Sequence, residues 1–213
     1  MEISFNLPNS IHLSGEYVIL KPNISEEQFW QVANEDANFE LIDGVLVIHS
    51  PASTEHEQIF HYLSQLISIF IDEPKRGQVL GSRLVMRLSE KWNPEPDLMV
   101  ILPENYSRIA STKINGPADI VVEILSDATR ELDLNKKIPQ YLTSGVKEIW
   151  VIDPSERAVS IYSQSSRRTY NNPESDTEIQ SEIIKDIKII EKWIWHRTSF
   201  PAVKIIKEYL KDQ

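Results

Sequence analysis

The amino-acid sequence predicts a mixed α/β fold in which a sheet is flanked by helices. Short apolar runs of strand length recur along the chain, and one long stretch with apolar residues at helical spacing lies between the early and the later runs. A second, shorter helical stretch lies between two of the later runs. The order strands, helix, strands, helix, strands is typical of the α/β (α+β) class.

Length and composition are those of one soluble globular domain. The 213 residues can bury a real core, and the hydrophobic fraction of 41% and the charged fraction of 25% are ordinary. Apolar runs stay short of the roughly 18 residues of a membrane span. The N-terminus lacks a signal-peptide pattern and cysteine is absent, so we expect a cytoplasmic protein with no membrane partner. The net charge of -10 argues against bulk attraction to nucleic acid, although it does not exclude a nuclease, whose metal-site carboxylates are themselves negative.

The N-terminal part is predicted to form a strand, a helix and a hairpin. Residues 17–20 are apolar and predict an added strand. The capping-box pattern Ser25–Gln28 predicts a helix that starts there and runs to about Asn34. Residues 39–48 predict a β-hairpin, because Asp43-Gly44 supplies the positive φ angles of a tight primed turn.

The longest helix is predicted over residues 55–72. The pattern Thr54–Glu57 is a second capping box, and Pro74 ends the helix. The core side of this helix is a wide apolar stripe formed by Ile59, Tyr62, Leu63, Leu66, Ile67 and Phe70. Residues 78–88 then predict a strand with an irregularity at Gly81-Ser82.

Two short apolar runs, residues 97–101 and 119–125, predict buried strands, with a polar loop or short helix over 104–115 between them. A helix over about residues 134–144 follows, with Gly145 as its C-cap. Pro139 fits this helix only if the helix begins near Lys136, because proline is tolerated in the first turn and disruptive later.

The rest of the chain is predicted to contain more strands and a closing helix. We expect residues 163–180 to be an exposed polar excursion. The predicted elements are strands over 149–152, 158–162 and 188–195, and a helix over 201–210.

Two carboxylates stand out because they lie on the short apolar strands. A lone buried carboxylate such as Glu123 is costly unless it is paired or bound to a cation. Asp97 opens the other run, directly after Pro96. If the two strands are neighbours, both side chains reach one metal ion, and the backbone carbonyl of Ile124 can join them. Oxygen ligands of this kind suit Mg or Mn. The alternative is that Asp97 caps a turn and Glu123 pairs with Arg or Lys.

For each of the other candidate residues, an ordinary structural or solvent-exposed role is the alternative to a functional one. Lys137, or its neighbour Lys136, can polarise an attacking water or stabilise transition-state charge, but spacing alone favours a solvated helix face. Glu40 lies on the first strand of the hairpin, where an edge-strand glutamate is usually solvated. His56, in the first turn of the long helix, is more often a local hydrogen-bonder than a ligand or base. Motifs of hydrolases with a serine elbow, of nucleotide-binding loops and of zinc proteases are absent.

The ordered set of short motifs resembles the Uma-two family of restriction-endonuclease-like proteins, within the PD-(D/E)XK nuclease superfamily. The resemblance covers about residues 25–165, so we expect one domain over 1–213 with that core and a C-terminal strand and helix appendage at about 183–210. The motifs that carry the resemblance are Glu40-Leu41-Ile42-Asp43-Gly44, Ser50-Pro51, Glu55-His56, Pro96-Asp97, Val122-Glu123-Ile124-Leu125-Ser126, Thr129, Asp133-Leu134, Lys137, Tyr141, Gly145-Val146, Glu148 and Trp150-Val151-Ile152-Asp153-Pro154.

The resemblance implies a restriction-endonuclease-like mixed sheet with an N-terminal helix and β-hairpin, and a Mg-dependent phosphodiesterase site. Pro96-Asp97 matches the PD element, and Glu123 matches the acidic residue of the second element. The lysine of that element is missing, since Leu125 occupies its place, and Lys137 matches a lysine that the family carries on the following helix. Glu40 matches the upstream acidic residue.

The resulting hypothesis is a metal-dependent endonuclease that hydrolyses DNA. Asp97, Glu123 and the carbonyl of Ile124 would bind Mg or Mn, Glu40 would assist through a second ion or a water, and Lys137 would support the transition state. Cutting both strands needs two active sites, so a homodimer is expected. The alternatives are an inactive binding or scaffold protein with the same fold, and a nuclease that acts on RNA or branched DNA.

Overall fold

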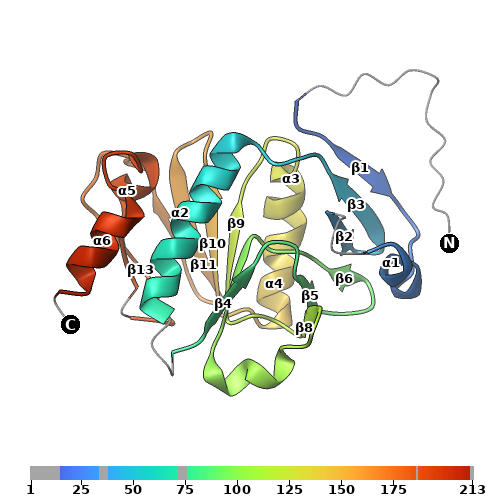
Figure 1. Ribbon diagram of the computed structural model, residues 1–213. Coiled ribbons are helices and arrows are strands. Elements are labelled where there is room, and N and C mark those ends of the chain that lie inside the picture. The colour runs from blue at the N-terminus through green and yellow to red at the C-terminus, as the bar shows by residue number, and fades with distance from the viewer. Residues whose placement is uncertain (1–14, 34–37, 72–75, 186, 212–213) are drawn as a thin grey trace.

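The chain forms a mixed α/β fold, as predicted, around a six-stranded sheet (Figure 1). The computed structural model describes residues 15–33, 38–71, 76–185 and 187–211. Within this sheet β9 (Ile120–Ile124) and β10 (Glu148–Asp153) pair in parallel, and the other neighbouring strands are antiparallel. In spatial order its strands are β12 (Arg167–Tyr170), β11 (Ala158–Ser163), β10 (Glu148–Asp153), β9 (Ile120–Ile124), β7 (Leu98–Ile101) and β4 (Gln78–Gly81).

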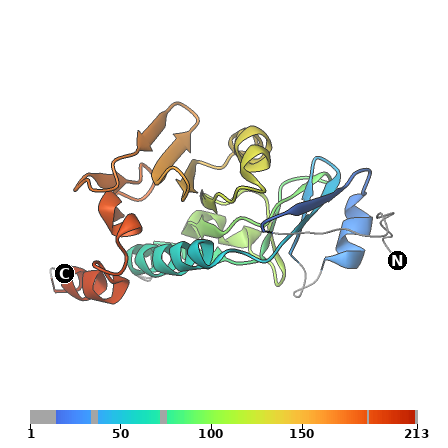
Figure 2. The same cartoon turned by 90° about the horizontal axis from the view of Figure 1, so that it is seen from above.

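Helices cover both faces of this sheet. Figure 2 shows α2 (Thr54–Ile71) and α4 (Ile138–Ser144) on opposite sides of the strands. Alternate residues of β9 divide between the two layers, because side chains of a strand point to opposite faces in turn. Val122 packs in the hydrophobic cluster with α2, and Val121 packs in the cluster with α4. Glu123 follows the same alternation and therefore points to the side of α4.

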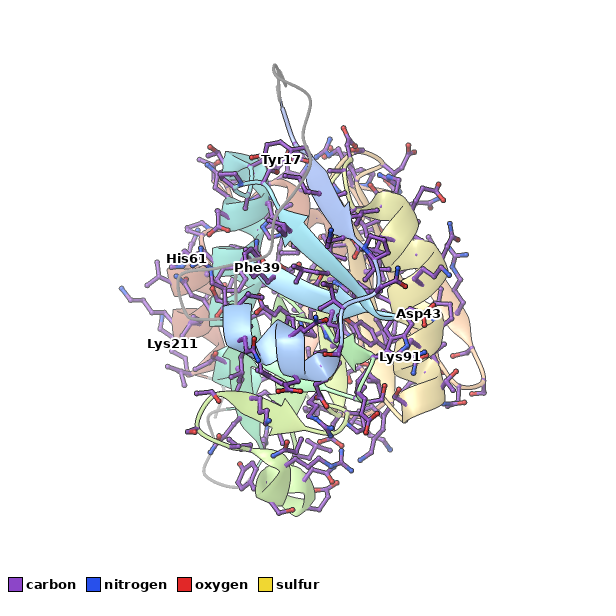
Figure 3. All side chains as sticks on the ribbon, turned by 90° about the vertical axis from the view of Figure 1, so that its right-hand side faces the viewer. Tyr17, Phe39, Asp43, His61, Lys91 and Lys211 are labelled. Carbon is purple, nitrogen blue, oxygen red and sulfur yellow. The ribbon has the colours of Figure 1, made fainter. Side chains whose placement is uncertain are left out.

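A second sheet of four strands lies at one end of the molecule (Figures 1 and 3). Its order is β1 (Val18–Lys21), β3 (Val45–His49), β2 (Phe39–Ile42) and β6 (Trp92–Asn93). The predicted primed turn joins β2 to β3, with φ angles of 53° at Asp43 and 75° at Gly44. The helix α1 (Glu26–Val32) begins with the predicted capping box, in which Ser25 and Gln28 each accept the other's backbone N–H.

The C-terminal elements pack against α2 at the other end of the molecule (Figure 1). They are β13 (Glu178–Gln180), β14 (Lys188–Ile190), α5 (Glu191–Trp195) and α6 (Ala202–Tyr209). The remaining elements are β5 (Val85–Arg87), β8 (Lys113–Asn115) and the 3-10 helix η1 (Pro103–Arg108). Among the helices of the described residues, none combines the length and the apolar character that a bilayer crossing requires.

Four local predictions need correction. The strand expected over 188–195 ends at Ile190, and residues 191–195 form the helix α5. The expected strand over 78–88 is divided into β4 and β5, which belong to different sheets, because Ser82 and Arg83 adopt positive φ angles and turn the chain. Residues 163–180 contain β12 and β13. The polarity of β12 hid this strand, since it lies at the sheet edge where its outer side faces water. The cap of α2 is Ser53 and not Thr54, because the Ser53 side chain accepts the His56 N–H at 3.2 Å.

The helix after β9 begins earlier than predicted and contains a π-helical segment. It consists of α3 (Arg130–Leu132), the π-helical η2 (Asp133–Lys137) and α4, and it ends at Gly145 in the left-handed conformation, as expected. The wide turn is marked by the bond from the Ile138 N–H to the Asp133 carbonyl, five residues back. A regular turn would bring the ring of Pro139 against the carbonyl of Asn135. The widened turn relieves that clash and explains why the helix continues through a proline.

Removal of a core side chain from α2 tests this packing. Leu66 is fully buried between α2 and the sheet, so Leu66→Ala should lower the free energy of unfolding by about 2–5 kcal/mol. The matched control is Leu210→Ala, because Leu210 is 57% exposed and its truncation should change that free energy by no more than about 0.5 kcal/mol. Urea denaturation of both variants measures the difference, and equal losses would contradict the assignment of the core.

Candidate active site

A small cavity of about 100 Å³ lies where the C-terminal end of β9 meets the four-stranded sheet and the α3–α4 helix. All four side chains predicted to act in catalysis line it, as does Ile124. They come from four places in the sequence: β2, the start of β7, the end of β9 and the π-helical segment. Those four side chains are Glu40, Asp97, Glu123 and Lys137.

Lys137 is the buried centre of the cluster. Its ammonium nitrogen lies 2.9 Å from Glu123 Oε1, 3.0 Å from Glu40 Oε1 and 3.2 Å from Asp133 Oδ1. Its neighbour Lys136 is exposed. An ammonium has three N–H donors, so these three carboxylates occupy all of them. The interpretation that spacing alone favours, in which Lys137 lies on a solvated helix face, is therefore wrong.

Glu40 is fully buried, which also overturns the expectation of a solvated edge-strand residue. The reason is its strand, because β2 lies between β3 and β6 and is not at the sheet edge. Besides Lys137, Glu40 contacts His49 Nε2 at 2.8 Å and accepts the backbone N–H of Glu95 at 2.8 Å. Glu40 therefore links the four-stranded sheet to the helix that carries Lys137.

Asp97 and Glu123 lie next to each other across neighbouring strands, β7 and β9. Asp97 Oδ2 accepts the backbone N–H of Ile124 at 2.7 Å, and Glu123 Oε1 accepts the hydroxyl of Tyr141 at 2.6 Å. In a strand, the N–H and the C=O of one residue point to the same edge. The carbonyl of Ile124 therefore faces the edge at which Asp97 lies.

Several polar side chains of the cluster lie outside the predicted catalytic set. Asp133 is buried beside Lys137, and the i, i+4, i+8 spacing of Asp133, Lys137 and Tyr141 on one helix was the signal that could have found it. His56 Nε2 lies 3.3 Å from Asp97 Oδ1, so this histidine does more than bond its own helix. No sequence signal marked Glu95, because only the fold brings it against Glu40.

Burial and mutual repulsion raise the pKa of some of these carboxyl groups, whereas cationic partners lower the pKa of another. Burial raises the pKa of Glu123 to about 8, and the charges of Asp133, Asp97 and Glu40 add to the effect of burial against the influence of Lys137. Burial likewise raises the pKa of Glu95 to about 8, with the charge of Glu40 next in effect. Against the same burial, Lys137 and His49 hold the pKa of Glu40 at about 2. Glu40 is thus the ionised partner of Lys137.

His56 and Lys137 both favour their charged forms. Burial alone would lower the pKa of His56, but the hydrogen bond and charge of Asp97 raise it to about 8. Burial would also lower the pKa of Lys137, but Glu123 and Glu40 raise it well above its usual value. The site therefore carries an excess of acidic groups around two cationic ones.

The donor set fits a hard divalent cation. Asp97, Glu123 and the Ile124 carbonyl supply only oxygen atoms, which Mg and Mn prefer. The raised pKa of Glu123 and the buried Glu95 Oε2, which lacks a hydrogen-bond partner among the described residues, both indicate negative charge that Lys137 alone does not neutralise. Across the described residues, three or more His, Asp or Glu side chains nowhere form a metal-binding group, so the proposed ligand set is two carboxylates and a carbonyl.

The fold is shared with a solved structure, and the family is shown by a match to a family model. A solved structure described as "a putative nuclease belonging to DUF820 from Anabaena variabilis" has the same fold, with a TM-score of 0.70 and 19% sequence identity. The match covers 81% of this chain and 97% of that one. The family model Uma2, described as "Putative restriction endonuclease", matches residues 26–189, and the chain belongs to this family. A search of curated proteins finds no match.

The raised pKa of Glu95 predicts that Glu95→Gln increases the free energy of unfolding relative to the wild type as the pH rises. In the folded state Glu95 keeps its proton up to about pH 8, whereas in the unfolded state it ionises near 4.5. Its stabilising contribution is therefore complete below pH 4.5 and is lost as the pH rises through about 8. In EDTA, the unfolding free energy of the wild type should fall relative to the variant between pH 5 and 8, by up to about 1.4 kcal/mol per pH unit. Parallel pH profiles would contradict the buried, protonated Glu95.

Proposed function

We propose that this protein is a Mg- or Mn-dependent endonuclease that hydrolyses phosphodiester bonds of DNA. The observation that carries the proposal is the convergence of Asp97, Glu123 and Lys137 in one cavity, although they come from three separate elements. Membership of the Uma2 family and the nuclease fold of the solved neighbour support it. Burying so many acidic groups is costly, so a function that requires them is the simplest reason for their presence.

Asp97 and Glu123 would hold the cation together with the carbonyl of Ile124. A bound Mg or Mn lowers the pKa of a bound water and neutralises charge on the phosphate. The Ile124 N–H fixes one oxygen of Asp97, which leaves Oδ1 directed toward His56 and the cavity. The Tyr141 hydroxyl donates to Oε1 of Glu123 and so orients this carboxylate.

Lys137 would stabilise the negative charge that develops on the phosphate. Its three donors are all occupied by carboxylates, so one carboxylate must release a donor before the ammonium contacts a substrate oxygen. We propose that Glu123 is the carboxylate that releases this donor, because it is also a proposed ligand of the cation. Glu40 stays ionised and keeps Lys137 charged and aimed at the site.

The substrate and assembly follow from the same reasoning. Cleavage of both strands of a duplex requires two active sites, so we propose a homodimer that acts on DNA. RNA or branched DNA as substrate, and a fold retained for binding without catalysis, are the competing outcomes of the experiments below.

Replacement of Lys137 should abolish catalysis while replacement of its neighbour should not. Lys137→Met removes the ammonium from the cavity, and cleavage of plasmid DNA in Mg should fall by at least about 10²-fold. Lys136→Met is the matched control, because Lys136 is exposed one residue away. Circular dichroism checks that Lys137→Met is folded, since the variant leaves three carboxylates without their partner. Equal cleavage by the two variants would refute the role of Lys137.

Metal binding can be measured apart from catalysis. Isothermal titration of the wild type with Mg or Mn should give a binding signal, and Asp97→Ala should weaken it at least about tenfold, the loss that even indirect partners of a metal cause. The exposed Asp176, which pairs with Lys192, supplies the control variant Asp176→Ala. Absence of any metal binding by the wild type would favour the inactive binding protein.

A further inference from the structure

A second, larger cavity opens from the active-site cavity beside the turn between β4 and β5. It has a volume of about 670 Å³. The two cavities share lining residues, among them His56, Glu95 and Asp97, so they form one continuous hollow. Ser82 and Arg83 line the outer part only. A polymeric substrate that reaches Asp97 therefore has room to continue past this turn.

The turn itself is held in an unfavourable backbone conformation. Ser82 and Arg83 have φ angles of 53° and 67°, in the left-handed region that residues other than glycine rarely adopt. Such conformations persist where the surrounding structure imposes them, and they cluster at ligand-binding sites. The strain thus marks this turn as a position where the direction of the Arg83 side chain matters.

The backbone of Asp97 imposes the conformation. The Ser82 N–H donates to the Asp97 carbonyl oxygen at 3.1 Å. Gly81 lies so close to Asp97 that a Cβ atom at this position would be 2.3 Å from the same carbonyl oxygen. Arg83 is therefore built into a fixed position relative to the proposed metal ligand.

Carboxylates line much of the hollow, so an anionic substrate needs a positively charged side chain there to bind. The outer cavity is lined by three carboxylates, Glu57, Glu95 and Asp97, and among the described residues Arg83 is its only lysine or arginine. Lys137 lines the inner cavity but not the outer one. Each part of the hollow thus has one lysine or arginine, Lys137 in the inner part and Arg83 in the outer part.

We propose that Arg83 binds a backbone phosphate of the nucleic-acid substrate, adjacent to the phosphate that is hydrolysed at Asp97 and Glu123. This inference rests on the proposed nuclease function and specifies how the substrate strand lies in the hollow. The planar guanidinium offers a fork of donors that matches two phosphate oxygens. A phosphate contact sets the register of the strand without reading bases, so this contact is independent of sequence.

Steady-state cleavage of a duplex oligonucleotide by Arg83→Gly tests the proposal. Glycine accepts the positive φ without strain, so the thermal stability of this variant should equal or exceed that of the wild type. KM should rise about tenfold with little change in kcat, because the lost contact is made equally in the ground state and the transition state. Binding measured in EDTA over a range of salt should show a slope reduced by about 1.

Two further variants separate charge from position. Arg83→Gln should raise KM as Arg83→Gly does, whereas Arg83→Lys should keep the salt slope and lose only part of the affinity. Arg167→Gln is the matched control, because Arg167 is exposed on β12 and lies outside both cavities. Its KM and salt slope should be those of the wild type.

The outcomes distinguish this inference from the proposed function. If Lys137→Met abolishes cleavage but Arg83→Gly and Arg83→Gln leave KM and the salt slope unchanged, the role of Arg83 is refuted and the nuclease stands. A loss confined to kcat also refutes the phosphate contact. A wild type that neither binds nor cuts duplex DNA, branched DNA or RNA overturns both proposals.

Discussion

The structure depends on one buried ammonium group. Lys137 lies out of water among three carboxylates, and a buried charge of this kind is tolerated only when its partners are close and its donors are all used. The partners come from β2, from β9 and from the same helix. The ion-pair cluster therefore joins the four-stranded sheet, the six-stranded sheet and the α3–α4 helix at one point, and that point is also the floor of the candidate active site.

The same cluster leaves the site with more acidic groups than its one ammonium can neutralise. One ammonium cannot neutralise Glu40, Glu123 and Asp133 together, and Asp97 and Glu95 lie beside them. Burial, together with this crowding of carboxylates, raises the pKa of Glu123 and of Glu95, so protons on both balance the charge in the absence of another cation. A divalent ion can take the place of those protons. Acidity that would destabilise a scaffold is therefore consistent with the metal-dependent function proposed above.

Local irregularities of the backbone carry much of the geometry of the site. The π-helical turn before Pro139 widens the helix where Asp133 and Lys137 enter the cavity. The left-handed residues Ser82 and Arg83 turn the chain beside Asp97 and end the pairing of β4. Both features interrupt a regular element at the point where that element borders the cavity. The regular strands and helices form a rigid frame, and the interruptions direct side chains from that frame into the hollow.

Local patterns in the sequence were enough to predict most of the elements and the four candidate catalytic residues. Hydrophobic periodicity, capping residues and turn pairs depend on neighbours along the chain, so α2, the β2–β3 hairpin and the strands holding Asp97 and Glu123 were predictable, and the order of the motifs pointed to the family. Tertiary structure alone decided that β2 is an inner strand, that Glu40 is buried, and that Glu95 and His56 join the site. The physical reason is that burial and charge depend on groups that are distant in sequence, and only folding brings these together.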